Sequence, residues 1–337
     1  MTGPPLLSVR GLAKTYAGRG GVKLRALDGV SFDLARGETL GIVGESGCGK
    51  STLARAVLRL TEPSGGDVLF EGESLLTLSK RALARRRADM QIIFQDPFGA
   101  LNPRHKVRRL VAEPLIVHRR EWRARVPELL ALVGLDSDAA GRFAHEFSGG
   151  QRQRIAIARA LALSPKLLVA DEPVSALDVS IQSQIINLIG DLRAAFGLSM
   201  LFISHDLSVI RHVSTRIAVM YFGRIVEKGA AADVLENPAH PYTRALLAAV
   251  PRAGAPKRAA AVIEGETPDP ANPPQGCAFR SRCRDAMEVC ARETPELVMR
   301  HTAAGPRETA CHLHSPLPAK AWGEGHDPAL QSRRVPR

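Results

Sequence analysis

Eight residues near the start of the chain set its architecture: Gly44-Glu45-Ser46-Gly47-Cys48-Gly49-Lys50-Ser51. They fit the pattern G-x-x-x-x-G-K-[ST] in full. Residues 38–43, which precede them, are almost wholly apolar and predict a short buried strand, and the helix formers of residues 50–60 follow. Strand, glycine-rich turn and helix in this order predict a phosphate-binding loop, because loop N–H groups and the positive end of the helix dipole face one point.

This loop predicts a site for the phosphates of ATP together with Mg²⁺. Lys50 is expected to neutralise the β- and γ-phosphates, and the Ser51 hydroxyl is expected to ligate Mg²⁺. Cys48 is expected to contribute only its backbone. The residues expected to contact the nucleotide here are Gly44, Glu45, Ser46, Gly47, Cys48, Gly49, Lys50, Ser51 and Thr52.

A pair of acids follows the apolar strand predicted over residues 167–170. Ligands bind at the carboxyl edge of a parallel sheet, where this strand would end. Asp171 is therefore expected to hold Mg²⁺, and Glu172 is expected to polarise the attacking water as general base. Two acids after a strand are by themselves more often the cap of a helix, so this prediction depends on the phosphate-binding loop.

The remaining pattern predicts an α/β protein. Alternation of apolar and polar residues over 6–34, with turn residues at 18–21, predicts an antiparallel sheet. Residues 80–147 are mostly helical in pattern, whereas residues 200–204 predict another buried parallel strand. The other expected elements are a helix over 181–196 and, from 217–226 onward, two strands and a helix.

At 337 residues the chain is long enough for about two domains. Its formal net charge of +12 attracts polyanions, but few aromatic residues could stack on bases, so we expect a solvated surface and no nucleic-acid partner. No apolar segment approaches the roughly 20 residues of a membrane span, and residues 1–10 lack a signal pattern, which predicts a cytoplasmic protein. The basic residues are spread over 81–87, 104–109, 119–125 and 333–337.

The last quarter of the chain changes in composition. A linker rich in Ala, Pro and Gly is predicted beyond Pro251, and a disordered tail is predicted over 321–337. Four cysteines lie between these segments, with five, six and twenty residues between successive members. Such a group favours a metal site over disulfides in a cytoplasmic chain, and a [4Fe-4S] cluster, Zn²⁺ and unligated thiols are the alternatives. The four are Cys277, Cys283, Cys290 and Cys311.

A second motif, Phe147-Ser148-Gly149-Gly150-Gln151, resembles the signature of ABC ATPases, which few other P-loop ATPases contain. The remaining motifs of that family stand around it in the same order. By this resemblance Tyr16 stacks on adenine, Gln95 is the Q-loop glutamine at the metal and the reacting phosphate, residues 175–178 are the D-loop, and His205 is the switch histidine at the γ-phosphate.

The resemblance implies that two such domains face each other head to tail, with each ATP between the P-loop of one and the signature of the other. Ser148 and the backbone N–H groups of Gly149 and Gly150, with Gln151 beside them, would contact the γ-phosphate across the interface. Asp178 of the D-loop is also expected at the nucleotide. ATP then joins the two domains and hydrolysis releases them, which a membrane partner converts to transport.

Within the family, Leu101-Asn102-Pro103-Arg104 and His240-Pro241-Tyr242-Thr243 resemble the peptide and nickel importers, as does Asn272-Pro273-Pro274-Gln275-Gly276-Cys277. Phe147 and Gln151-Arg152-Gln153-Arg154 resemble the second of two ATPase types that these importers pair, which implies a heterodimer. The resemblance also implies two transmembrane permease subunits, an external solute-binding protein and a peripheral position on the cytoplasmic side of the inner membrane. It favours iron-sulfur at the four cysteines.

The expected fold is a P-loop α/β core of the ABC ATPase type with an N-terminal antiparallel β subdomain, a helical signature subdomain and a short C-terminal extension. The nucleotide-binding domain is expected over residues 1–251, with its helical subdomain over about 96–160, and the cysteine-bearing extension over 252–337. The resemblance implies ATP hydrolysis that powers import of dipeptides or oligopeptides. The alternatives are a soluble ABC ATPase acting on nucleic acid, an exporter ATPase, and the ATPase of a nickel or other solute importer.

Overall fold

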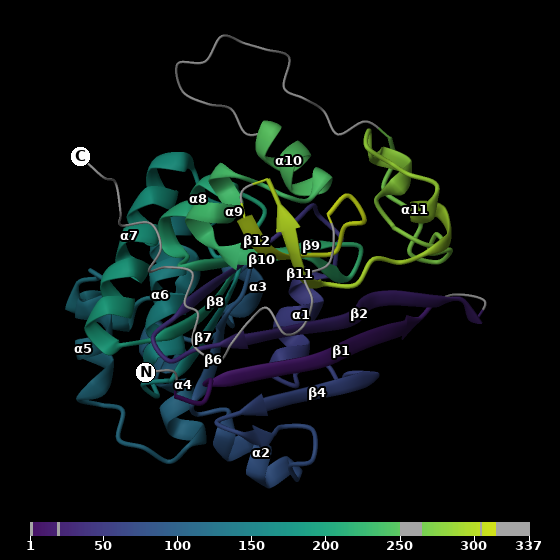
Figure 1. Ribbon diagram of the computed structural model, residues 1–337. Coiled ribbons are helices and arrows are strands. Elements are labelled where there is room, and N and C mark those ends of the chain that lie inside the picture. Colours follow the sequence, from purple (N-terminus) through teal and green to yellow (C-terminus); the bar gives the residue numbers. More distant parts are fainter. Residues whose placement is uncertain (1–2, 19–20, 250–264, 304, 315–337) are drawn as a thin grey trace.

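The computed structural model describes residues 3–18, 21–249, 265–303 and 305–314. Its main layer is an eight-stranded sheet (Figure 1), in which β9, β3, β8, β7 and β6 are parallel neighbours. Three further strands add antiparallel at the β9 edge. In sheet order the strands are β11 (Val298–Thr302), β12 (Gly305–Thr309), β10 (Arg224–Ala230), β9 (Arg216–Tyr221), β3 (Thr39–Val43), β8 (Ser199–Ser204), β7 (Leu167–Asp171) and β6 (Met90–Ile93).

A second, antiparallel sheet is built mainly from the N-terminal residues. Helix α1 (Lys50–Val57) lies between the two sheets, and its apolar side chains share one core with both. Burial on both faces explains why β3, β7 and β8 are almost wholly apolar. The strands of the second sheet, in order, are β2 (Lys23–Leu34), β1 (Leu7–Ala17), β4 (Gly65–Phe70) and β5 (Glu73–Ser74).

Helices cover the opposite face of the main sheet and form a separate lobe beside it (Figure 1). The longest described helix is α7 (Val179–Phe196), which ends at Gly197 in the left-handed conformation that favours glycine. The other helices are α2 (Lys80–Arg86), α3 (Pro97–Ala100), α4 (Val107–Val117), α5 (Arg125–Leu132), α6 (Gly149–Leu161), α8 (Leu207–Val213), α9 (Ala231–Glu236), α10 (Pro241–Ala248) and α11 (Val289–Arg292), with short 3₁₀ turns η2 (Ser137–Gly141), η3 (Ala144–Glu146) and η4 (Arg280–Arg282).

The predicted fold class is confirmed, but two parts of the secondary structure were predicted wrongly. Residues 90–93 were assigned to a helical segment and instead form β6, which pairs with β7 at the end of the sheet. The C-terminal hairpin of β11 and β12 and strand β4 were not predicted at all. The linker proposed after Pro251 and the tail over 321–337 lie largely or wholly outside the described residues.

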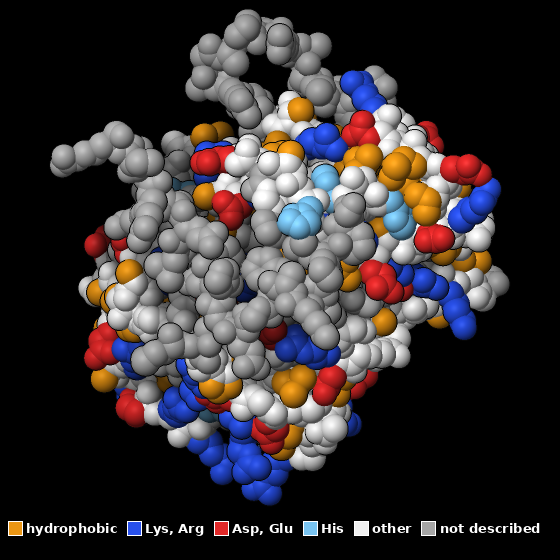
Figure 2. Space-filling view, in the orientation of Figure 1, with side chains coloured by type: hydrophobic (Ala, Val, Ile, Leu, Met, Phe, Trp, Pro, Cys, Tyr) orange, Lys and Arg blue, Asp and Glu red, His pale blue; other side chains and the backbone are white. Residues whose placement is uncertain are grey.

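The surface carries both signs of charge. Figure 2 shows Lys and Arg side chains gathered at the lower end of the view, where Figure 1 places α2, whose seven residues include Lys80, Arg81, Arg85 and Arg86. Elsewhere on this face the basic groups alternate with Asp and Glu. None of the helices within the described residues is long and apolar enough to cross a bilayer.

Candidate functional site

The phosphate-binding loop leaves β3 and enters α1, as predicted, and its glycines are required by close backbone contacts. A side chain at Gly44 would put its Cβ 2.2 Å from the Met220 carbonyl oxygen. Gly49 has a φ of +105°, and a Cβ there would lie 2.3 Å from the Ala26 carbonyl oxygen. Only glycine fits both positions, so the loop backbone stays close to β9 and β2, which carry Met220 and Ala26.

Lys50 is the buried cation of this loop, with 5% of its surface exposed. Its ammonium donates to the carbonyl oxygens of Gly44 at 2.8 Å and Glu45 at 3.0 Å. The same nitrogen lies 3.6 Å from a carboxylate oxygen of Glu172. A cation thus lies between the loop and the strand ends opposite it, where it can attract anionic ligands.

Glu172 is contacted by side chains from the ends of two neighbouring strands. The Gln95 amide, after β6, donates to Glu172 Oε2 at 3.1 Å. His205 Nδ1, after β8, lies 3.1 Å from the same oxygen. Because β6, β7 and β8 are parallel, their carboxyl ends meet at one sheet edge and bring these three residues together. Glu172 itself has a φ of +46°, an uncommon conformation outside glycine that marks local backbone strain.

Ser51 and Asp171 form the second contact between the loop and the strand ends. The Ser51 hydroxyl donates to Asp171 Oδ1 at 2.9 Å. Burial raises the pKa of Asp171, the hydrogen bond from Ser51 opposes this rise, and the charge of Glu172 adds to it. A hydroxyl and a carboxylate side by side are oxygen donors of the kind that Mg²⁺ prefers.

A cavity of about 890 Å³ opens between the loop and these strand ends, which is large enough for a nucleotide. It brings together Lys50, Gln95, Glu172 and His205, as the sequence predicted. Two residues of the predicted D-loop, Ser175 and Ala176, also line it, whereas Ala26, Asp96 and Leu246 were not predicted, and of these only Asp96 adjoins a predicted residue. The other predicted residues on its wall are Gly44, Glu45, Ser46, Gly47, Gly49, Ser51 and Thr52.

Comparison with known proteins agrees with this geometry. Residues 27–175 match the ABC transporter family, and residues 226–290 match the C-terminal region of oligopeptide/dipeptide transporters. The oligopeptide transport ATP-binding protein AppF of Bacillus subtilis is 50% identical over 92% of this chain and 98% of its own length. The dipeptide transport ATP-binding protein DppF of Escherichia coli is 48% identical over 87% of this chain and 91% of its own length.

The chain belongs to the ABC transporter family of ATPases. Among solved structures, the dimeric bacterial ABC transporter cassette MJ0796 superposes with a TM-score of 0.62 at 31% identity, covering 67% of this chain and 98% of that one. The likeness therefore takes in nearly the whole of that cassette. It agrees with the two-sheet core and helical lobe described above.

The ABC signature lies away from the cavity. Ser148 caps the N-terminus of α6, where its hydroxyl accepts the Gln151 N–H at 3.4 Å and its own N–H donates to the Gln151 side chain at 3.0 Å. Ser148 and Gln151 are exposed, and Gly149 and Gly150 are half-buried. None of these four residues is among the described residues that line the cavity.

Four other predicted residues are not among the described residues that line the cavity: Asp171, which hydrogen-bonds to the lining residue Ser51, and Tyr16, Cys48 and Asp178. Tyr16, at the end of β1, is 38% exposed, and the Lys14 ammonium lies 4.9 Å from the centre of its ring. Asp178 is an exposed residue that precedes α7. Cys48 is buried behind the loop, and burial raises the pKa of its thiol, so it is a poor nucleophile there. The roles assigned to Tyr16 and Asp178 stay predictions.

The four C-terminal cysteines are neighbours, but the predicted metal site is not supported. Burial raises the pKa of the Cys311 thiol to about 11, and the neighbouring Cys277, Cys283 and Cys290 add to the rise. The Cys277 N–H donates to the Cys290 carbonyl oxygen at 2.8 Å. In the part of the chain that the structure describes, however, no three His, Cys, Asp or Glu side chains are arranged to hold a metal ion.

Proposed function

We propose that this chain binds ATP in the 890 Å³ cavity and hydrolyses it to power the import of peptides through a membrane permease. The observation that carries the proposal is the convergence of Lys50, Gln95 and His205 on Glu172. The proposal that the transported substrate is a peptide rests on two similarities. The relatives are named for oligopeptide and dipeptide transport, and residues 226–290 match the C-terminal region of such transporters. These similarities favour a peptide importer over an exporter, a nickel importer or an ATPase acting on nucleic acid.

Glu172 is the proposed general base of hydrolysis. Its carboxylate would accept the proton of the attacking water, while Gln95 and His205 fix its orientation through the two contacts at one oxygen. His205 would also donate to the γ-phosphate. Lys50 would attract the β- and γ-phosphates, and the N–H groups of the loop would surround them.

Mg²⁺ would be held by Ser51, which lines the cavity, and by Asp171, which accepts the hydrogen bond of the Ser51 hydroxyl at 2.9 Å. The ion supplies positive charge to the phosphate oxygens. Gln95 is a proposed further ligand at the same edge. Tyr16 would stack on adenine, because its ring is exposed at the end of β1, which pairs with β2, and Ala26 of β2 lines the cavity.

Replacing Glu172 with Gln tests the catalytic assignment. The variant should bind ATP normally, while its rate of hydrolysis should fall by about 10²- to 10⁴-fold, the usual worth of a positioned base. Phosphate release by the purified transporter and binding of a fluorescent ATP analogue measure the two effects. Glu236→Gln, an exposed change on α9, should hydrolyse ATP at the wild-type rate. Near-normal turnover of Glu172→Gln would contradict the assignment.

The assembly and location are proposals of the same kind. We expect a heterodimer with a second ABC ATPase, two permease subunits and an external solute-binding protein, at the cytoplasmic side of the inner membrane. The names of the relatives, which are ATP-binding proteins of oligopeptide and dipeptide transport, support a partnership with a permease. Co-purification with the products of neighbouring genes, followed by uptake of labelled peptide or of Ni²⁺, identifies the partners and the solute.

For Cys277, Cys283, Cys290 and Cys311 we retain the [4Fe-4S] cluster as a proposal, with Zn²⁺ as the alternative. Its support is the hydrogen bond from the Cys277 N–H to the Cys290 carbonyl oxygen, which holds two of the four cysteines side by side. Ligation would require the protons to leave and the thiols to move together. Iron, acid-labile sulfide and zinc assays on anaerobically purified protein decide among cluster, zinc and free thiols.

A further inference from the structure

Glu45, the second residue of the phosphate-binding loop, is held by an arginine from the cysteine-bearing extension. Arg282 Nη1 lies 2.7 Å from Glu45 Oε2, and Arg282 Nη2 lies 2.9 Å from Glu45 Oε1. This is a two-point contact between planar groups, the strongest form of such a pair. Only 5% of the Arg282 side chain and 25% of the Glu45 side chain are exposed, so solvent screens the pair weakly.

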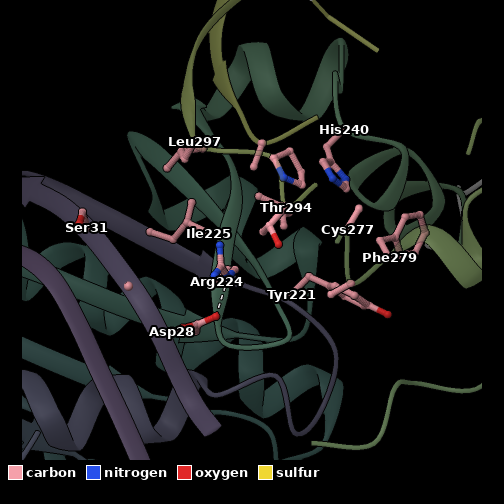
Figure 3. Close-up of a pocket in the computed structure, with 15 residues that line it drawn as sticks. Asp28, Ser31, Tyr221, Arg224, Ile225, His240, Cys277, Phe279, Thr294 and Leu297 are labelled. Carbon is pink, nitrogen blue, oxygen red and sulfur yellow. Dashed lines mark hydrogen bonds and ion pairs between the residues drawn. The ribbon is translucent and has the colours of Figure 1, made fainter. Parts of the chain in front are cut away.

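The backbone of Glu45 has a partner in the same region. Its N–H donates to the hydroxyl of Tyr242, from α10, at 2.8 Å. Tyr242 is fully buried, and its ring centre lies 4.6 Å from that of Tyr221 and 5.4 Å from that of Phe279. Phe279 comes from the extension, and Figure 3 shows it beside Tyr221 at one end of a cavity of about 90 Å³. The aromatic cluster of Tyr221, Tyr242 and Phe279 therefore packs the extension close to Glu45.

The segment that carries Arg282 is itself fixed. The side chain of Arg280 donates to the carbonyl oxygens of Gln275 at 2.5 Å and Ala291 at 2.8 Å, which ties the turn η4 to the residues on either side. Arg282 also lies 3.4 Å from the Tyr221 hydroxyl. The fixed turn and the Tyr221 hydroxyl thus hold the Arg282 guanidinium next to Glu45.

The charge of Glu45 explains why such a partner is needed. Glu45 lines the cavity proposed for ATP, together with Lys50 and Ser51. A carboxylate in a phosphate-binding loop repels the triphosphate, and partial burial makes this repulsion stronger than it would be in water. Arg282 supplies the compensating charge, and the Tyr242 hydroxyl takes up the Glu45 N–H.

We propose that Arg282 is a positioning residue for ATP binding, through which the C-terminal extension sets the charge and the backbone course of the phosphate-binding loop. The proposal rests on the assignment of the cavity as the ATP site. It gives the extension a function in the nucleotide cycle that depends on no metal at the cysteines. Because Arg282 does not contact Glu172, its effect belongs to binding and not to the chemical step.

Binding and turnover of ATP by the purified transporter test the proposal. Arg282→Met should raise the KM and the Kd for ATP about tenfold and change kcat less than about twofold, because the unpaired carboxylate opposes binding. Glu45→Gln should bind ATP at least as tightly as wild type. The double variant Glu45→Gln/Arg282→Met should return the Kd to within about threefold of wild type, since no charge is left unpaired.

The different effects expected of Arg282→Met and Glu45→Gln on ATP binding distinguish a positioning role from support of the fold alone. If Arg282 only attached the extension, then Glu45→Gln, which breaks the same contact, would weaken ATP binding, and the double variant would be as weak as Arg282→Met. Either result overturns the proposal. Arg244→Met is the matched control, because Arg244 joins α10 to the extension through an exposed pair with Asp285 at 3.0 Å and should leave ATP binding unchanged.

Failure of the ATP-site assignment would give a different result. Lys50→Ala should abolish ATP binding if the cavity is the nucleotide site. If Lys50→Ala binds ATP normally, the assignment of the cavity is wrong. If Lys50→Ala fails to bind and Arg282→Met behaves like Arg244→Met, the site stands and the positioning role of Arg282 is wrong.

Discussion

Glycine positions in the phosphate-binding loop differ in how strictly they require glycine. Gly47 and Gly49 both have positive φ values, +80° and +105°. A Cβ atom at Gly47 would have open space around it to 4 Å, whereas at Gly49 that atom would lie 2.3 Å from the Ala26 carbonyl oxygen. At Gly47 only backbone strain would oppose a side chain, whereas at Gly49 a clash with the backbone of β2 is added.

Gly49→Ala should therefore destabilise the protein by about 3 kcal/mol and abolish ATP binding, because the loop must move to relieve the clash. Gly47→Ala should cost only about 1 kcal/mol, the strain of one left-handed residue, and should retain binding. Denaturant titration and binding of a fluorescent ATP analogue compare the two variants. Equal effects at both positions would mean that the contact with Ala26 does not restrict the loop.

At the scale of single residues, the sequence predicted the side chains that meet at Glu172 but did not predict Arg282, which holds the phosphate-binding loop. Lys50 and Glu172 were predicted from their own motifs and His205 from the resemblance to ABC ATPases, and the three meet in the structure. Arg282 was not predicted, because its partner Glu45 lies 237 residues away and no local pattern relates them. Spacing identifies residues that belong to one motif, whereas a pairing between distant segments depends on how the whole chain folds.

Among the elements, α10 begins with an unusual buried cap. The His240 Nδ1 atom accepts the Tyr242 N–H at 3.0 Å, and the ring is 2% exposed. Burial lowers the pKa of His240 from 6.5 to about 3, and the charge of Arg244 adds to this effect. Protonation would remove the acceptor, so the cap of α10 depends on the neutral ring.

This cap predicts a pH dependence of folding. Since the pKa of His240 is lower in the folded state, its contribution to stability is present above pH 6.5 and is lost as the pH falls toward 3. Between pH 7 and pH 5 the expected loss of unfolding free energy is about 2 kcal/mol. His240→Asn keeps an oxygen acceptor without a titrating group and should lose about 2 kcal/mol less over this range.

Urea titrations at pH 7 and pH 5 measure the difference. His301→Asn, which replaces an exposed histidine on β11, is the matched control and should follow wild type. If His240→Asn showed the same pH dependence as wild type, the buried ring would not be the group that titrates.

Elements were predictable where apolar periodicity dominates. β3, β7 and β8 are buried throughout and were predicted from their apolar runs. β6 is only four residues long and follows a helical segment, so its pattern was too short to separate from a helix. β12 escaped prediction because its buried positions include the charged Arg307, which lies 3.1 Å from the fully buried Glu227 on β10. A buried ion pair takes the place of apolar residues on β12, so the apolar pattern that predicts a buried strand is missing there.

In the whole molecule, only some of the residues predicted to bind ATP lie around the cavity. Lys50 and Glu172 line the cavity, but Ser148 and its neighbours lie at the N-terminus of α6, away from it. The N-terminus of a helix that carries two glycines offers N–H groups to an anion, yet these groups stand apart from the ATP cavity of their own chain. A second ATPase subunit facing this one head to tail would bring each signature to the other's cavity, an arrangement that the proposed dimer provides.

Ser148→Arg should therefore impair hydrolysis at the partner's ATP site and not binding at its own. The large cationic side chain would occupy the place of the γ-phosphate contact, and loss of such electrostatic contacts typically costs about 100-fold in rate. Photo-crosslinking of labelled ATP reports which subunit retains nucleotide, and phosphate release reports turnover of the assembled transporter. Arg125→Ala, which removes an exposed pair with Glu128 on α5, should leave both measurements unchanged. If Ser148→Arg instead abolished ATP binding to its own chain, signature and P-loop would act within one subunit, and the head-to-tail arrangement would be wrong.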